Sequence, residues 1–228
     1  LPLVVYIALA GHQLRLPGLH NDEAQEAGLP ALQLVGGGQV TTFRDVGVGP
    51  RHYPLMVQDY IGAINVYLVA PFVALLGPSV VSVRLPSLLV GVATLMTTFG
   101  FTSAIWGKRA AFLAAGLLAI NPSFVFWSRQ GVLIASLTLM LSVSLMWVGF
   151  NWARRGGWQW ALPVGFLAGL GIYAKILFVW VVLGLVGAVV VLNLPLLWHR
   201  TWRAWPRRPT LGEGCAASIG LIVGLLPL

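Results

Sequence analysis

The sequence predicts an all-α, polytopic integral membrane protein with about seven transmembrane helices and further helices in its first outer loop. Its 228 residues are 58% hydrophobic and only 9% charged, whereas soluble domains carry about 25% charged residues. Several apolar runs approach the roughly 20 residues that cross a bilayer as a helix. The basic residues lie in short loops between these runs. They therefore indicate membrane orientation, and not nucleic-acid binding, despite the net charge of +8.

The whole chain, residues 1–228, is predicted to form one membrane module. It begins and ends inside hydrophobic runs, so we expect the module to be incomplete at both ends. Residues 15–81 form a polar outer loop with juxtamembrane helices, and its apolar part, residues 55–76, carries Gln58, Asp59 and Asn65. The predicted membrane segments are residues 1–14, 82–106, 110–127, 132–152, 158–174, 176–198 and 212–228, with a break at Lys175.

The basic loops predict the orientation. Lys108/Arg109, Arg154/Arg155 and a cluster of Arg200, Arg203, Arg207 and Arg208 should be cytoplasmic, and two crossings separate each group from the next. Asp22 can lie on the opposite side only if residues 55–76 do not cross but lie along the outer interface or re-enter. The same count gathers Asp22, Glu23, Arg84, Arg129 and Lys175 on the extracytoplasmic face of a plasma or inner membrane.

The stretch "GLHNDEAQEAG", residues 18–28, holds half of the six acids in the chain. A carboxylate can act as general base toward a hydroxyl, and Arg and Lys bind phosphate. Acids and bases at an outer lipid interface therefore suit a phosphorylated lipid substrate. The alternatives stay open. Asp22 and Glu23 could begin an interfacial helix, and Glu26 fits a solvated face.

Arg84, Arg129 and Lys175 are the candidates for binding the phosphate of the donor, and membrane anchoring by snorkelling is the alternative for each. Tyr53, in "RHYPL", is the candidate on the acceptor side, and an interfacial belt residue is its alternative. Cys215 is the single cysteine, and the four histidines show no metal-ligand spacing. A Cys-based zinc site is thereby excluded within the chain.

The order of several motifs resembles the GT-C glycosyltransferases. "GLHNDEAQEAG" is followed by "HYPLMVQDYIGAINVYLVAPFVALLG", "VRLPSLLVGV", "WGKRAAFLAAGLLAINPSFVFWSRQG" and "GFLAGLGIYAKILF". This set, over about residues 15–195, is similar to the branch of protein O-mannosyltransferases and aminoarabinose transferases, which is glycosyltransferase family 39-like.

The resemblance implies an inverting transfer of a sugar from a polyprenyl-phosphate donor to a hydroxyl of a protein, lipid or glycan acceptor. It implies that Asp22 is catalytic, that Glu23 contributes to catalysis or to a divalent metal, and that Arg129 and Lys175 bind the donor phosphate. Two departures matter. The sequence "RQGVLIASLTL" lacks an Asp that some members carry after the Arg position, and members continue well past residue 228.

Two other classes of function compete with this one. A non-catalytic GT-C-like subunit of a larger membrane complex would keep the fold without the chemistry. A transporter is disfavoured, because the sequence has no internal repeat and no matching pair of broken helices.

Overall fold

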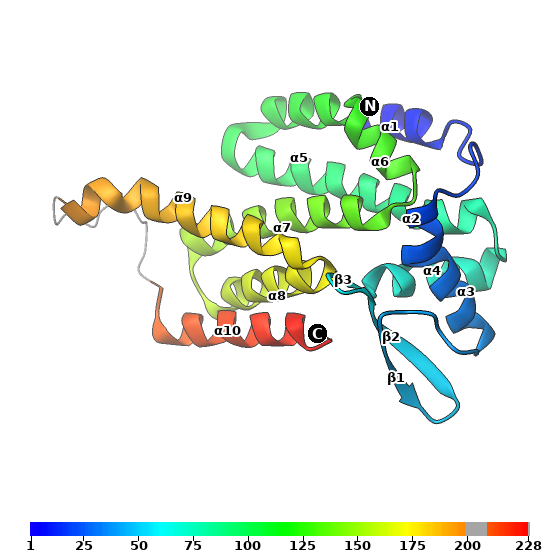
Figure 1. Cartoon of the computed structure of the whole chain (residues 1–228). Coiled ribbons are helices and arrows are strands. Elements are labelled where there is room, and N and C mark those ends of the chain that lie inside the picture. Colours follow the sequence, from blue (N-terminus) through cyan, green and yellow to red (C-terminus); the bar gives the residue numbers. More distant parts are fainter. Residues whose placement is uncertain (199–208, 228) are drawn as a thin grey trace.

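The computed structural model describes residues 1–198 and 209–227, and most of these residues are helical (Figure 1). The first helices are α1 (Pro2–Gly11), α2 (Asn21–Glu23), the π-helix η1 (Ala24–Gly28) and α3 (Leu29–Gly36). Three strands follow, β1 (Arg44–Val48), β2 (Arg51–Gln58) and β3 (Ile61–Gly62). The remaining elements are α4 (Ile64–Leu76), α5 (Val80–Ala119), α6 (Pro122–Arg129), α7 (Leu133–Arg155), α8 (Trp158–Ala174), the 3₁₀-helix η2 (Ile176–Phe178), α9 (Val179–Trp198) and α10 (Leu211–Leu225).

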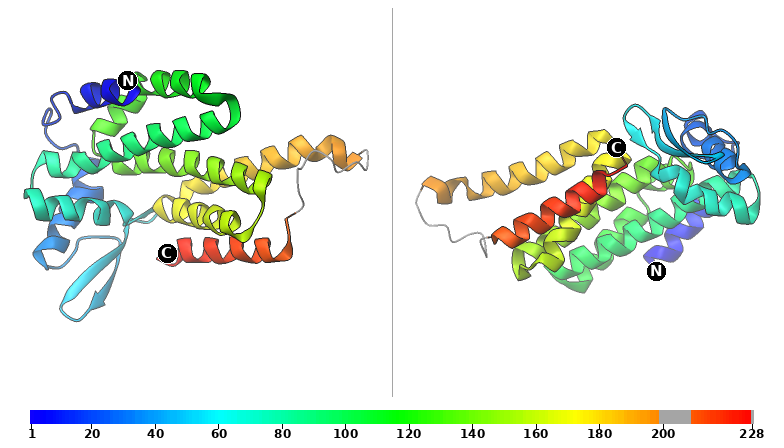
Figure 2. Two further views of the ribbon diagram at one scale, coloured as in Figure 1. Left: turned by 180° about the vertical axis from the view of Figure 1, so that it is seen from behind. Right: turned by 90° about the horizontal axis from the view of Figure 1, so that it is seen from below.

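The long helices run in roughly one direction and form a bundle, and the elements of the predicted outer loop gather at one of its ends (Figures 1 and 2). The turn inside α5 and the α7–α8 connection lie at the other end. Lys108/Arg109 and Arg154/Arg155 are therefore at the end opposite to Asp22, as the sequence predicted. The cluster at Arg200, Arg203, Arg207 and Arg208 lies outside the described residues.

Helix α5 reverses direction at Gly107, whose φ of 83° and ψ of 171° are not helical. This confirms that separate helices precede and follow the "WGKR" turn. The predicted segment 110–127 is wrong as one continuous helix, because α5 ends at Ala119 and α6 begins at Pro122. The reason is local: Asn121 caps the new helix by accepting a hydrogen bond from the N–H of Phe124 at 3.0 Å.

The outer loop contains a small antiparallel sheet in the order β1-β2-β3, so the all-α prediction is wrong here. Val46 pairs with Tyr53 across the hairpin, and Gly49 supplies the positive φ of 62° that its tight turn uses. Residues 55–76 are thus divided between strands and α4. The β-branched and aromatic residues of β2 favour a strand, but only the packing of the loop decides between strand and helix.

Residues 55–76 nevertheless stay at the end of the bundle where Glu23 lies. The N–H of Ala63, just before α4, donates to Tyr173 Oη at 3.1 Å, and Ile61 forms a β-bridge with Lys175. The rest of α4 packs on η1, α3 and the start of α5 through Ala27, Ala31, Val66, Val69 and Val83. The path of the chain therefore agrees with the prediction that this segment does not cross the bundle.

Within the described residues, two helices are long and apolar enough to cross a membrane, Val80–Ala119 and Ile134–Arg155. Shorter apolar helices are Pro2–Gly11, Ile64–Leu76, Ile176–Val191 and Leu211–Leu225. The figure of about seven crossings stays a prediction.

Helices α8 and α10 run in parallel and touch through glycines. A Cβ at Gly165 would collide with the carbonyl of Ala217, and one at Gly220 with the carbonyl of Leu162. Such close approach through small residues is typical of helix pairs in lipid. The N–H of Gly157 donates to the buried carboxylate of Glu213, and this contact joins the beginnings of the two helices.

Candidate functional site

The acidic stretch begins a helix, and His20 is its N-cap. The N–H of Asp22 donates to His20 Nδ1 at 3.3 Å, and the N–H of His20 donates to Glu23 Oε2 at 3.0 Å. The two contacts form a reciprocal capping box. Asp22 and Glu23 lie in the first helical turn, where carboxylates stabilise the positive end of the helix dipole. The helix-start interpretation of these acids is therefore correct, and it does not exclude chemistry.

Glu23 forms a buried ion pair with Arg84 from the first turns of α5. Arg84 Nη2 donates to Glu23 Oε2 at 3.0 Å, and Nε donates to Oε1 at 3.1 Å. The exposed fractions of the two side chains are 0% for Glu23 and 1% for Arg84. Charges so far from water persist only when they are paired and hydrogen-bonded, and this pair meets both conditions.

The other donors of Arg84 hold the loop that leads into the acidic stretch. Nη1 donates to the carbonyls of Leu14 at 2.8 Å and Leu16 at 3.4 Å, and Nη2 donates to that of Gly18 at 3.1 Å. All five N–H groups of the guanidinium therefore have protein acceptors. The geometry favours a positioning role for Arg84 over the predicted role in binding phosphate.

Gly131 lies directly against this ion pair. It has a φ of +64°, and a Cβ at this position would lie 3.1 Å from Arg84 Cγ and 3.5 Å from Glu23 Cδ. A glycine is needed here both for the backbone conformation and for the close contact. The "SRQG" motif at residues 128–131 is thereby joined to the acidic stretch.

Asp22 takes no part in the ion pair and remains accessible. About half of its side chain is exposed (49%), and Oδ2 lies 3.7 Å from His20 Nδ1. Adjacent acids therefore have different environments, since Glu23 is bonded to an arginine and Asp22 is open to solvent. Of the two, only Asp22 has a carboxylate free to meet an incoming hydroxyl.

Glu26 is buried, contrary to its predicted place on a solvated face. Its side chain is 8% exposed, and its Oε2 has no hydrogen-bond partner among the described residues. Burial raises the pKa of Glu26 most, the charge of Asp22 raises it further, and the charge of Lys175 lowers it. Glu26 lies in η1, and a π-turn redirects side chains relative to an α-helix. In the sequence, only the small residues Ala27 and Gly28, which follow Glu26, indicated that this part of the helix packs closely against a neighbour.

Lys175 interrupts the helices at the predicted break. Its φ of −152° and ψ of 119° are extended, and it pairs with Ile61. Nζ lies 5.8 Å from the centre of the Tyr60 ring, a cation–π contact. Because its charge acts on Glu26, Lys175 belongs to the same group of charges as Asp22.

Arg129 ends α6 and contacts the chain that leaves α1. Its Nη2 donates to the carbonyls of His12 at 2.9 Å and Gln13 at 3.3 Å. The side chain is half-buried, and no hydrogen bond joins its Nε or Nη1 to a described residue. Part of the guanidinium thus remains available to a ligand.

Tyr53 lies in the middle of β2, opposite Val46. Its side chain is half-buried. No contact in the described part of the chain joins it to Asp22, so its assignment to the acceptor side remains a hypothesis.

The donor set does not fit the suggested metal at Glu23. Both oxygens of Glu23 accept hydrogen bonds, from Arg84 and from the N–H of His20. In residues 1–198 and 209–227 no group of three or more His, Cys, Asp or Glu residues could hold a metal ion.

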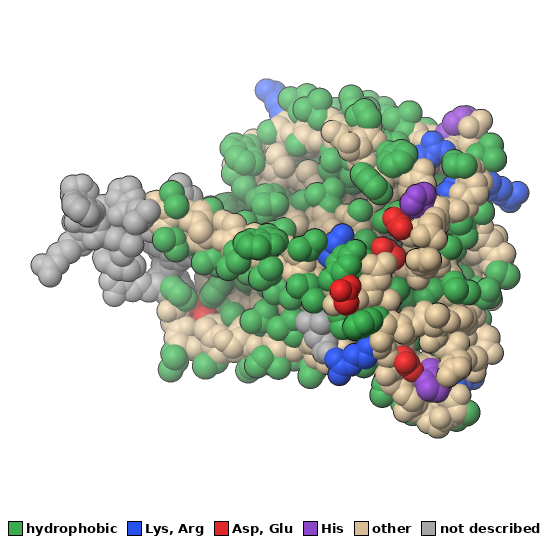
Figure 3. Space-filling model, in the orientation of Figure 1, with side chains coloured by type: hydrophobic (Ala, Val, Ile, Leu, Met, Phe, Trp, Pro, Cys, Tyr) green, Lys and Arg blue, Asp and Glu red, His purple; other side chains and the backbone are tan. Residues whose placement is uncertain are grey.

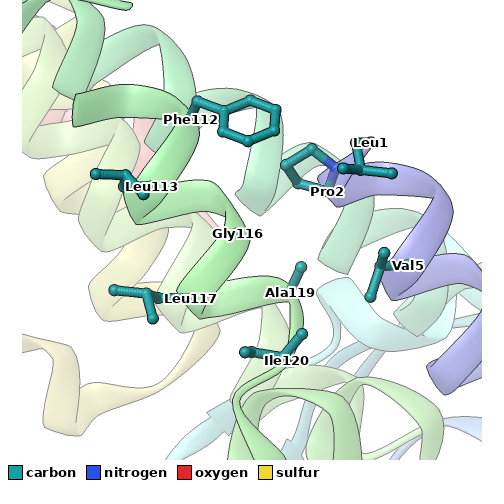
Figure 4. A pocket seen from close by; sticks show the side chains of 9 residues that line it. All are labelled: Leu1, Pro2, Val5, Phe112, Leu113, Gly116, Leu117, Ala119 and Ile120. Atoms are coloured by element: carbon teal, nitrogen blue, oxygen red, sulfur yellow. The ribbon is translucent and has the colours of Figure 1, made fainter. Parts of the chain in front are cut away.

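Charged side chains of both signs gather over the end of the molecule that carries α2, α3 and the sheet, and apolar side chains cover much of the bundle beside them (Figure 3). A separate groove of about 270 Å³ lies between α1 and the second half of α5 (Figure 4). Apolar residues and Gly116 line it, so it offers no group for acid–base chemistry.

Residues 64–222 match the dolichyl-phosphate-mannose-protein mannosyltransferase family. The chain belongs to this family. It is a family of membrane glycosyltransferases that use lipid-linked sugars. The matched residues include most of the helix bundle. The GT-C resemblance of the sequence motifs is thereby confirmed.

Curated relatives agree with the family. The undecaprenyl phosphate-alpha-4-amino-4-deoxy-L-arabinose arabinosyl transferase of Pseudomonas aeruginosa (strain UCBPP-PA14) is 24% identical over 99% of this chain and 38% of its own length. The enzyme of the same name from Pseudomonas paraeruginosa (strain DSM 24068 / PA7) gives the same values. A provisionally named mannosyltransferase of Bacillus subtilis (strain 168), YkcB, is 30% identical over 45% of this chain and 14% of its own length.

The chain spans 38% of the length of the arabinosyl transferases that it matches. No solved structure matches it significantly.

Proposed function

We propose that the chain provides the donor and general-base part of an inverting glycosyltransferase on the extracytoplasmic face of the membrane. The donor is a sugar linked to polyprenyl phosphate, and the acceptor is a hydroxyl. The relatives support the donor class, since the Pseudomonas enzymes are named for the transfer of a sugar linked to undecaprenyl phosphate.

The observation that carries the proposal is the different environment of two adjacent acids: Arg84 binds the buried Glu23, while the carboxylate of Asp22 stays half-exposed. Asp22 and Lys175 form one group of charges with Glu26, since both act on the pKa of Glu26. A transferase of this kind needs a base on the acceptor side of the anomeric carbon and cations beside the departing phosphate. Asp22 is the accessible carboxylate of the group, and Lys175 is its cation.

In the proposed reaction, Asp22 accepts the proton of the acceptor hydroxyl as its oxygen bonds to the anomeric carbon. The bond from that carbon to the phosphate oxygen breaks, and the polyprenyl phosphate leaves with both bonding electrons. Lys175 and the free nitrogens of Arg129 stabilise the charge that develops on the phosphate. Arg84 holds Glu23 and residues 14–18, so that the helix carrying Asp22 starts at a fixed place.

The test is the Asp22→Asn variant of the full-length protein in lipid nanodiscs. Asp22 is half-exposed and takes part in the N-terminal cap through its backbone N–H and not through its carboxylate, so folding and binding of undecaprenyl phosphate should remain. Transfer from an undecaprenyl-phosphate sugar should fall by about 10² to 10⁴. Asp45→Asn, in the exposed hairpin, is the matched control and should transfer at the parental rate. Equal rates for Asp22→Asn and the parent would refute the catalytic role.

A non-catalytic subunit of a membrane complex remains the second candidate. The observation in its favour is that protein groups already accept hydrogen bonds from all the N–H groups of Arg84 and from one nitrogen of Arg129. These donors are not available to a lipid phosphate. Stoichiometric copurification with a partner, together with absence of transfer by the parental protein, would favour it.

A further inference from the structure

A second concave site lies beside the acidic helix, between η1 with the start of α3 on one side and the sheet on the other. Its volume is about 570 Å³. It is lined by residues 41–43 and 57–59 together with Gln25 and Leu29. We call it the loop groove. Asp22, Glu23, Arg84, Arg129 and Lys175 are not among its lining residues.

The polar groups of the loop groove are free to bind a ligand. Among the described residues, the side chains of Gln25, Gln58 and Asp59 form no hydrogen bond. The hydroxyl of Thr42 is buried in the wall without a partner, which is unusual, because buried polar groups are nearly always bonded. By contrast, Thr41 is fixed at both its N–H and its hydroxyl by Gln33 at 2.8 and 3.0 Å.

Phe43 adds an aromatic surface to these polar groups. Its side chain is 64% exposed at the edge of the groove, although a phenyl ring gains free energy by burial. A sugar ring offers complementary surfaces, since its C–H faces cover an aromatic ring and its hydroxyls donate to and accept from amides and carboxylates. Asp59 is the one charged side chain that lines the groove, so an acceptor carrying phosphate would be repelled.

The loop groove continues from the proposed base. Gln25, in η1, and Leu29, at the start of α3, follow Asp22 by three and seven positions in one continuous helical segment. A ligand that contacts Gln25 in the groove therefore lies within about one helical turn of Asp22 along this segment. Because residues 41–43 and 57–59 line the groove and no residue of α5 to α10 does, its ligand arrives from water.

We infer that the loop groove binds the acceptor and that the acceptor is an uncharged glycan, whose receiving hydroxyl lies toward Asp22. The inference rests on the proposed function and names its acceptor. Phe43 contacts a face of one sugar ring, and Gln25, Gln58 and Asp59 bond its hydroxyls. These residues bind the acceptor and take no part in breaking the donor bond.

The experiment uses the full-length protein in nanodiscs with mannotriose and chitotriose as uncharged probes. Binding is followed by saturation-transfer NMR, and hydrolysis of the undecaprenyl-phosphate sugar is followed without acceptor. Phe43→Ala should weaken oligosaccharide binding about three- to tenfold, and Gln58→Ala should also weaken it. Phe43→Trp should keep it. Hydrolysis of the donor should be the same in all three variants, and Val48→Ala, at the hairpin tip, should change neither.

The outcomes separate the two proposals. If the parental protein does not hydrolyse or transfer the donor sugar, while oligosaccharide binding depends on Phe43, the proposed function fails and the groove stands as a glycan site. If the donor is processed but neither oligosaccharide binds, or binding is equal in Phe43→Ala and the parent, the inference is overturned. Phe43-dependent binding of a Ser/Thr-containing hexapeptide in place of both oligosaccharides would overturn it in favour of a protein acceptor.

Discussion

Arg84 Nη2 lies 3.0 Å from Glu23 Oε2, and both side chains are buried. The pair joins the start of α5 to the acidic stretch across 61 residues of sequence. It fixes where the helix with Asp22 begins, because the same guanidinium also holds the carbonyls of Leu14 and Gly18. The geometry of the proposed site thus depends on a residue that was first a candidate for phosphate binding.

Arg84→Ala should strongly destabilise the protein, because it leaves the carboxylate of Glu23 buried without a partner. Removal of one member of a buried pair typically costs about 3–5 kcal/mol. Thermal unfolding of the full-length protein in detergent measures the loss. Arg15→Ala is the matched control, since Arg15 is exposed and makes no hydrogen bond to the described residues. Unfolding of Arg84→Ala at the parental temperature would contradict the structural role.

The combined variant Glu23→Leu with Arg84→Met separates charge from packing. It removes both buried charges and leaves no ion without a partner, so it should be more stable than Arg84→Ala alone. If the double variant is the less stable of the two, the loop carbonyls that Arg84 binds matter more than its pairing with Glu23.

Replacement of Lys175 should weaken donor binding alone, whereas replacement of Arg129 should weaken both donor binding and stability. A charge-assisted hydrogen bond contributes roughly 1.5–3 kcal/mol, so Lys175→Ala should weaken binding of undecaprenyl phosphate by about ten- to hundredfold. Arg129→Ala should weaken it similarly and should also lower the unfolding temperature, because the contacts with His12 and Gln13 are lost. Calorimetric titration provides the affinities, with Arg51→Ala in the hairpin as control. Unchanged binding would remove that residue from the phosphate site.

The raised pKa of Glu26 predicts that the stability of the folded protein depends on pH. Its pKa in the folded protein is raised above the ordinary value of 4.5, first by burial. The protonated form therefore favours folding, and the contribution of Glu26 is complete below about pH 4.5 and is lost as the pH rises through the raised value. Glu26→Gln, which is neutral at every pH, should unfold at a higher temperature than the parent at pH 8, and the difference should shrink toward pH 5.

Thermal scans of the full-length protein at several pH values provide this comparison. Gln25→Glu is a useful control, because it adds an exposed carboxyl one position away and should show no such convergence with the parent. A constant difference between Glu26→Gln and the parent from pH 8 to pH 5 would mean that the buried carboxyl does not titrate as proposed.

The topology can be tested with single cysteines in a Cys215-free variant. Positions 22 and 129 should react with an impermeant thiol reagent added from outside, and positions 109 and 155 should not, because the two sets lie at opposite ends of the bundle. Reaction of positions 22 and 109 from the same side would show that residues 55–76 cross the membrane. The gathering of charges on the outer face would then be wrong.

Much of this organisation was predictable from the sequence, because it follows from patterns that are local in the chain. Apolar runs predict helices, Gly107 and Lys175 mark their breaks, and the basic loops separate one end of the bundle from the other. The ordered motifs predicted the family that residues 64–222 then matched. Helix propensity and hydrophobicity act over neighbouring residues, so these features are determined before any tertiary contact forms.

The tertiary structure decided which charges meet. Arg84 could anchor a lipid headgroup or pair with an acid, and only the packing of α5 on η1 brings Glu23 to it. Glu26 lies in a sequence typical of a solvated face, yet in the π-helix its side chain is buried and the charge of Lys175 acts on it. Desolvation and pairing depend on residues far away in the chain. For that reason no local pattern could assign one arginine to structure and one buried carboxyl to the site.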